Sequence, residues 1–297
     1  ENIGLVVTDE QHRFGVNQRK SLQNKGEFVD VLYLSATPIP RTYALTIYGD
    51  MDISIIKEKP AGRKEIKTTV LKFSELDKVI SSIEEEVKNG HQVYVVAPLI
   101  EENESDLNDV NTIYDLLSKN LKDIRIDILH GKMKNVDKDK VINNFKEGNL
   151  DLIISTTVIE VGVDVKNATL MVIFNAERFG LATLHQLRGR VGRGEYQSYC
   201  ILKFEGNGKT TKERMKVMCQ TNDGFIISEK DLELRGSGDF FGTEQHGIPE
   251  FKIANLFEDM GTLKKVQKIA MEIMADDPLL EKEKNIIFAE TGLFYDS

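Results

Sequence analysis

The chain has 297 residues, of which 40% are hydrophobic and 29% are charged. This is the composition of an ordinary soluble globular protein of about two domains. The formal net charge of −9 argues against a general electrostatic coat for nucleic acid, although it leaves room for a local basic patch. The sequence contains no run of 18 apolar residues, so no membrane span is predicted. Two cysteines, Cys200 and Cys219, are too few for a disulfide framework and fit a reducing cytosol.

Short apolar runs alternate with amphipathic stretches over the first two thirds of the chain. The runs predict strands at residues 3–7, 31–34, 66–71, 93–97, 124–129, 152–155, 170–174 and 199–204. The amphipathic stretches predict helices at residues 75–88, 110–120, 135–145 and 183–190. This alternation predicts an α/β fold with parallel sheets. It stops near residue 205, after which we expect helices at 210–220 and 263–275 on either side of a Gly-rich segment at 235–247.

A charged segment at residues 57–63, interrupted by Pro60 and Gly62, predicts a linker. Together with the end of the alternation near residue 205, it predicts three parts: residues 1–60, 61–205 and 206–297. The first apolar run lies only two residues from Glu1 and is expected to be a buried strand. Proteins rarely begin in this way, so we expect the chain to be a piece of a longer protein.

Acidic and hydroxyl residues follow the first two predicted strands. Asp9 and Glu10 come directly after the first strand, at the end where parallel sheets bind ligands. Two adjacent carboxylates there suit a hydrated magnesium ion and a base that activates water. Ser35 and Thr37 follow the second strand and can bond to the neighbouring acids or sense the nucleotide. A solvated acid pair and a helix N-cap are the respective alternatives.

Two further groups follow later strands. The segment 155–164 begins with three hydroxyl residues, including Thr156, and continues to Gly162 and Asp164, a pattern that suits phosphate and ribose binding. The segment 186–193 contains Arg188, Arg190 and Arg193. These are three of only 11 arginines in the whole chain, whose other 28 basic residues are lysines. Arginines spaced three apart on or near a helix can point the same way, which suits a γ-phosphate. Between residues 177 and 214 eight cations face four acids, which predicts a local basic surface.

Taken in order, these four groups resemble motifs II (9–12), III (35–37), V (155–164) and VI (186–193) of the superfamily 2 helicases. The segments 9–16 and 35–42 resemble the RecG branch of that superfamily. Residues 231–238 and 244–247 resemble the translocation motif that RecG shares with the transcription-repair coupling factor Mfd. Mfd usually has Glu where this chain has Gln11, so RecG is the better match.

The resemblance implies RecA-like domains, namely the end of a first one at 1–60, a second at 61–205, and a helical translocation region at 206–297. It implies an ATP-driven translocase on branched double-stranded DNA, with ATP and Mg²⁺ as cofactors, no membrane association, a monomeric whole protein and a place in the bacterial cytoplasm on the nucleoid. By this resemblance, Asp9 and Glu10 would bind magnesium and take part in catalysis, together with Gln11 and His12. Coupling of the nucleotide state to DNA would involve His12, Ser35 and Thr37.

The resemblance also implies ATP binding by Gly162, Asp164, Gln186, Arg190 and Arg193, of which Arg190 and Arg193 would contact the γ-phosphate and take part in catalysis. DNA contact or translocation would involve Thr156, Arg214, Arg235 and Gln245.

The chain departs from the pattern of the family in two respects. No GxxxxGK[ST] phosphate loop precedes Asp9, and the DNA-wedge domain that the resemblance implies is not found in this sequence. We therefore expect the isolated chain to lack meaningful ATPase activity. Three other hypotheses remain: a fragment of Mfd, a non-catalytic nucleic-acid-binding module of helicase ancestry, and a metal hydrolase that uses Asp9, Glu10 and His12. The scattered histidines and the absence of CxxC and HExxH motifs count against a zinc site.

Overall fold

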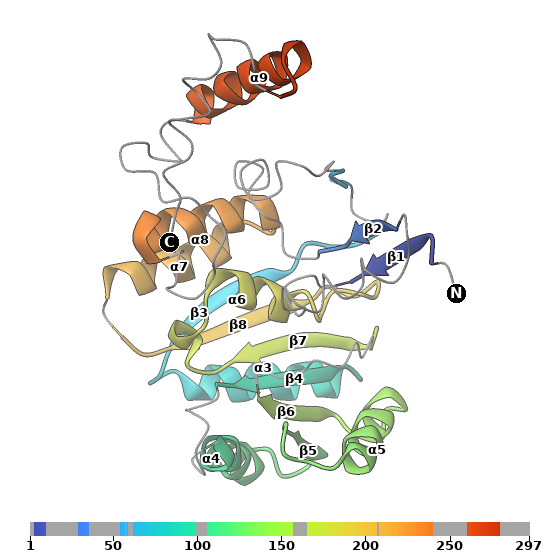
Figure 1. Ribbon diagram of the computed structural model, residues 1–297. Coiled ribbons are helices and arrows are strands. Elements are labelled where there is room, and N and C mark those ends of the chain that lie inside the picture. The colour runs from blue at the N-terminus through green and yellow to red at the C-terminus, as the bar shows by residue number, and fades with distance from the viewer. Residues whose placement is uncertain are drawn as a thin grey trace. The chain divides into compact units, whose positions relative to one another are not determined.

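The computed structural model describes residues 3–9, 29–35, 54–56, 58, 62–98, 106–156, 165–206, 208–239 and 260–279 (Figure 1). The described residues up to Leu234 belong to one compact unit, and those from Arg235 onward belong to a second. The boundaries that we expect near residues 60 and 205 stay predictions.

A six-stranded parallel sheet forms the centre of the first unit, as the alternating sequence pattern predicts. Its strands lie in the order β3 (Lys67–Lys72), β8 (Tyr199–Phe204), β7 (Ala168–Ile173), β4 (Gln92–Ala97), β6 (Leu152–Thr156) and β5 (Ile126–Leu129). All neighbouring pairs are parallel. Every residue of β4, β6 and β7 is buried, which explains why these segments are continuously apolar rather than alternating.

Helices cover both faces of this sheet. The helices α3 (Leu76–Lys88) and α4 (Asp106–Asn120) contribute to a core with Val95 and Ile154 on one face. The helices α5 (Asn135–Lys146), α6 (Leu181–Arg188) and α7 (Lys209–Gln220) contribute to a core with Tyr94 and Ile153 on the other face. Because successive strand residues point to opposite faces, neighbouring residues such as Tyr94 and Val95 belong to different cores.

A separate two-stranded parallel sheet consists of β1 (Leu5–Thr8) and β2 (Asp30–Tyr33). The sequence predicts a buried strand here, and that prediction is wrong for the described residues. Leu5 is 60% exposed and Val7 is 53% exposed. The physical reason is that β2 is the only strand paired with β1 in the described part of the chain, and no described helix contributes a core to this pair.

Three elements follow or interrupt the predicted pattern. A short 3₁₀ helix, η2 (Ala176–Arg178), links β7 to α6. The helix expected at 263–275 is α9, which spans Met260–Asp276. The helix α8 (Gly224–Asp239) was not predicted, because Gly224, Gly236 and Gly238 disfavour a helix and the segment lacks a clear apolar stripe. Among the helices that the structure describes, none is long and apolar enough to cross a membrane.

Candidate functional site

The residues after β1 and β2 lie side by side. Thr8 is paired with Tyr33 in the parallel register, and the Leu34 N–H donates to the Thr8 carbonyl at 2.8 Å. Asp9 and Ser35 therefore follow at the same edge of the small sheet, and both are exposed. The other predicted residues of this group, Glu10, Gln11, His12 and Thr37, lie outside the described residues. The strand pairing brings Asp9 and Ser35 to the same edge, while their chemical roles stay predictions.

Two buried hydroxyls lie at the carboxyl end of β6. Ser155 is fully buried and Thr156 is 2% exposed, and neither hydroxyl has a hydrogen-bond partner among the described residues. A buried polar group without a partner costs free energy, so such groups in native proteins usually meet another polar atom. Both hydroxyls are closed off from solvent among the described residues, and the contact between Thr156 and the DNA backbone stays a prediction. Gly162 and Asp164, from the same motif, lie outside the described residues.

Gln186, Arg190 and Arg193 lie on or directly after α6, and all three are half-buried. The helix ends at Arg188 with Gly189 as its C-cap, so Arg190 and Arg193 lie on the turn that follows rather than on the helix itself. The Arg190 N–H donates to the Leu187 carbonyl at 3.0 Å, and Arg193 Nε donates to the Gly189 carbonyl at 3.3 Å. The spacing of these residues is thus set by a hydrogen-bonded turn.

Glycines allow this turn, residues 189–194, to pack closely against the chain around it. Gly192 has a φ of +75°, and a Cβ built there would lie 3.0 Å from Cγ1 of Ile66. A Cβ on Gly194 would lie 2.5 Å from the Lys166 carbonyl oxygen, a backbone atom. From a segment that we interpreted as the end of a linker, Arg63 Nε donates to the Gly192 carbonyl at 3.0 Å. The turn is therefore fixed by contacts with residues distant in the sequence.

Replacing Gly194 by alanine is expected to destabilise the protein by about 1–3 kcal/mol, the usual cost of overpacking. The reason is that the new methyl group would overlap the Lys166 carbonyl, which is a backbone group and cannot rotate away. Gly131→Ala is the matched control, because a Cβ at Gly131 meets nothing within 4 Å. Urea unfolding of both variants measures the difference. Equal midpoints for the two variants would contradict the close approach at Gly194.

Arg188 differs from its two neighbours because its side chain lies inside the protein. It is 1% exposed, and its guanidinium donates to the Met218 carbonyl at 2.7 Å and to Thr68 Oγ1 at 3.2 Å. Burial lowers the pKa of this guanidinium, but arginine remains charged in proteins. Arg188 is therefore part of the interior that links α6 to α7 and β3.

The predicted basic surface is smaller than the count of cations suggests. Besides Arg188, Lys203 is 1% exposed, with its Nζ 4.5 Å from the ring centroid of Phe73 and 5.0 Å from that of Phe174. Burial lowers the pKa of Lys203. Arg214 on α7 donates to the Phe179 carbonyl at 2.9 Å and to the Glu177 carbonyl at 3.2 Å. These contacts give Arg214 a structural role in holding η2, and its role in translocation stays a prediction.

The helix α8 contributes a residue to the beginning of α6. Asp231 is 6% exposed, and its Oδ1 accepts a hydrogen bond from the Leu181 N–H at 3.3 Å. A carboxylate at this position accepts a hydrogen bond from an N–H group of the first helical turn, and its negative charge interacts favourably with the positive end of the helix dipole. Arg235 lies further along α8, and Gln245 lies outside the described residues. The sequence shows no signal for Asp231 or Arg63 as supports of motif VI, because their partners are 50 and 129 residues away.

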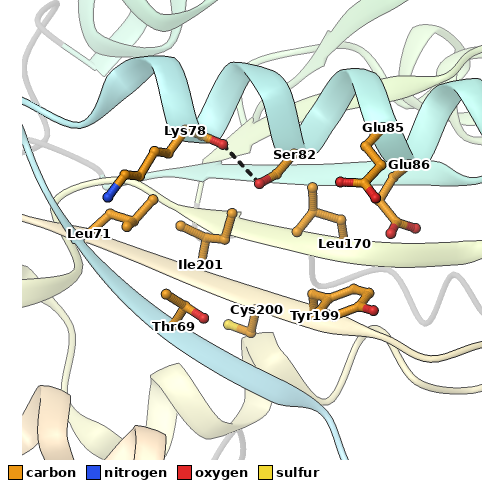
Figure 2. Close-up of a pocket in the computed structure, with 10 residues that line it drawn as sticks. All are labelled: Thr69, Leu71, Lys78, Ser82, Glu85, Glu86, Leu170, Tyr199, Cys200 and Ile201. Carbon is orange, nitrogen blue, oxygen red and sulfur yellow. Dashed lines mark hydrogen bonds between the residues drawn. The ribbon is translucent and has the colours of Figure 1, made fainter.

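A groove of about 300 Å³ runs between α3 and the strands β3, β8 and β7 (Figure 2). Lys78, Ser82 and Glu85 line it from the helix, and Leu71 and Tyr199 are among the residues that line it from the sheet. The Ser82 hydroxyl donates to the Lys78 carbonyl at 2.8 Å. None of the residues that the sequence predicts to be functional lines this groove. It is therefore separate from the motifs described above.

Two family models match the chain. The model of the helicase conserved C-terminal domain matches residues 71–195, and that of the C-terminal part of domain 3 of the ATP-dependent DNA helicase RecG matches residues 221–291. The chain is 51% identical over 277 residues to the ATP-dependent DNA helicase RecG of Bacillus subtilis, covering 93% of this chain and 41% of that protein. It is 48% identical over 300 residues to RecG of Staphylococcus aureus strain N315, covering all of this chain and 44% of that protein.

Solved structures give the same result. A structure of RecG bound to a three-way DNA junction is similar with a TM-score of 0.68 and 44% identity, covering 89% of this chain and 34% of that chain. Yeast Dbp5 bound to RNA and ADP BeF3 is similar with a TM-score of 0.55, 16% identity and coverage of 90% of this chain and 64% of that one. This second likeness concerns the fold alone. The chain spans less than half the length of the curated relatives that it matches.

Proposed function

Because the chain belongs to the RecG family of helicases, we propose that it is part of an ATP-driven motor that translocates on and remodels branched double-stranded DNA. The observation that carries this proposal is the similarity to RecG bound to a three-way junction, which extends over 89% of the chain. A whole protein of this kind would act as a monomer on the chromosome, in the bacterial cytoplasm.

Within this motor, the proposed residues belong to a nucleotide-binding site and a DNA-binding site. Asp9 and Glu10 would hold Mg²⁺ and position water, since carboxylates are the ligands that this ion prefers, and Asp9 lies at the carboxyl end of β1 where such ligands bind. Bound Mg²⁺ would neutralise charge on the β- and γ-phosphates. Gln186, Arg190 and Arg193 would contact the nucleotide, with Gly162 and Asp164. Thr156, the last residue of β6, would contact the DNA backbone.

The remaining proposed residues would take part in catalysis and in coupling ATP hydrolysis to translocation along DNA. Gln11 and His12 would complete the catalytic group that follows β1, and Ser35 and Thr37 would report the state of the nucleotide. Arg214, Arg235 and Gln245 would contribute to translocation, although the contacts of Arg214 to the carbonyls of Phe179 and Glu177 favour a supporting position.

A helicase that acts on branch points should hydrolyse ATP faster with a junction than with linear DNA. We expect the whole protein to be stimulated several-fold more by a three-way junction than by a linear duplex of the same length and base composition, measured as phosphate release. Equal stimulation by the two DNAs would mean that the motor does not distinguish branches. No stimulation by either DNA would favour a non-catalytic binding module.

A further inference from the structure

Arg188 combines almost complete burial with the absence of an acidic partner among the residues that the structure describes. It is 1% exposed, and none of the described ion pairs includes it. Its acceptors are instead neutral: the carbonyl of Met218, the hydroxyl of Thr68, and Nδ1 of His185, which lies 3.2 Å from Nη2. This last contact requires His185 to carry its proton on Nε2. Burying a charge without a counter-ion is unfavourable, so a specific arrangement must compensate for it.

The end of α7 provides that compensation. Met218 lies in the last turn of α7, which ends at Gln220, and carbonyls in the last turn of a helix lack partners within the helix. They also form the negative end of the helix dipole, which favours a cation. The neighbouring thiols do not act as counter-ions, because burial raises the pKa of Cys200 to about 12 and also raises the pKa of Cys219. Arg188 thus caps α7 from the end of α6.

This cap lies directly before the turn that carries the proposed nucleotide-binding arginines. Arg188 is the last residue of α6, and the Val191 N–H donates to its carbonyl at 3.3 Å. On the far side of the turn, Arg63 donates to the Gly192 carbonyl at 3.0 Å. The turn is therefore anchored at both sides by arginines that belong to the supporting structure. A shift of either anchor would move Arg190 and Arg193.

We propose that Arg188 is a positioning residue for ATP hydrolysis, which fixes the place of Arg190 and Arg193 by joining the end of α6 to α7 and β3. The inference rests on the proposed function of the turn. It explains why a charged residue occupies an interior position where a methionine would fill similar space without a buried charge. A methionine makes no directional hydrogen bonds, whereas the planar guanidinium fixes three acceptors on three segments in a single geometry.

The test compares Arg188→Met and Arg188→Lys in the whole helicase, each at a temperature where circular dichroism shows it to be folded. Displacing a catalytic group by about 1 Å can lower a rate on the order of 10²-fold. We expect Arg188→Met to lower kcat for junction-stimulated ATP hydrolysis by that order, with little change in the KM for ATP. Arg188→Lys retains the charge and can still reach one carbonyl, so it should recover part of the lost rate.

Arg125→Met is the matched control. Arg125 is exposed, forms its ion pair with Asp151, and lies before β5 at the other edge of the sheet, so its loss should leave kcat unchanged. A wild-type kcat in Arg188→Met, or a loss that Arg188→Lys does not partly recover, would overturn the proposal.

Hydrogen exchange gives a readout that does not depend on hydrolysis. In Arg188→Met the amides of Arg190 and Val191 should exchange faster than in the wild type, while those of β5 should not change. Unchanged exchange at both positions would also overturn the positioning role. If instead the wild type and Arg125→Met show no junction-stimulated hydrolysis, the proposed function fails, and hydrogen exchange still decides whether Arg188 anchors the turn.

Discussion

Replacing Arg193 by lysine in the whole helicase is expected to slow DNA-stimulated ATP hydrolysis by a factor on the order of 10³–10⁵, the usual contribution of an arginine finger. This factor corresponds to roughly 4–7 kcal/mol of transition-state stabilisation. Lysine retains the positive charge but loses the planar fork that binds two phosphate oxygens at once. Because Arg193 Nε donates to the Gly189 carbonyl, lysine also loses the contact that orients the side chain on its turn.

The measurement is steady-state phosphate release together with the equilibrium binding of a fluorescent ATP analogue. Binding should survive with a modest loss, because other proposed contacts to the nucleotide remain. Arg125→Lys provides the control for the substitution itself, since Arg125 is exposed and paired with Asp151. A variant that hydrolyses ATP at a near-normal rate would show that Arg193 is only part of a solvated turn.

Arg235→Ala and Gln245→Ala should uncouple ATP hydrolysis from translocation along DNA. In each variant of the whole helicase we expect DNA-stimulated hydrolysis to remain largely intact. Junction unwinding should fall steeply, because hydrolysis no longer moves the duplex. The reason is that both residues lie well beyond the last nucleotide motif in the sequence, in Gly-rich sequence that can approach a DNA backbone closely.

Parallel assays of ATP hydrolysis and junction unwinding make this test. Glu229→Ala is the matched control for Arg235, because Glu229 is an exposed residue of the same helix. Both test variants should melt close to the wild type, within the ~0.5 kcal/mol typical of surface substitutions. If hydrolysis and unwinding decline together, or if the variants melt early, the two residues support the fold and the translocation role is wrong.

The central sheet could be predicted from the sequence because burial on both faces leaves a direct signal. The strands β4, β6 and β7 consist mostly of apolar residues and end within about two residues of their predicted limits. The helix α8 left no such signal, since its glycines weaken helix propensity and its apolar residues do not form one stripe. Its formation depends on tertiary contacts, including the hydrogen bond between Asp231 and Leu181.

For the candidate site, the places of its residues along the chain could be predicted from the sequence, but their contacts could not. Motif order placed Asp9 and Ser35 after the first two strands, and these residues follow the paired strands β1 and β2. Thr156 is the last residue of β6, whereas Arg190 and Arg193 follow the helix α6. The sequence could not distinguish Arg188 from Arg190 and Arg193, since burial depends on α7, which lies 20 or more residues further along the chain. Nor could it connect Arg63 to Gly192, because that contact joins residues 129 positions apart.

The hydrogen bonds at the two ends of α6 also bear on which segments could be exchanged between related chains. Asp231 holds the first residue of α6, and the Met218 carbonyl holds the last, so both supports come from chain beyond residue 205. A chimaera joined at that residue would combine an α6 from one parent with supports from another. Recombination that preserves a stable fold should therefore inherit the stretch from Leu181 to Asp231 as one block.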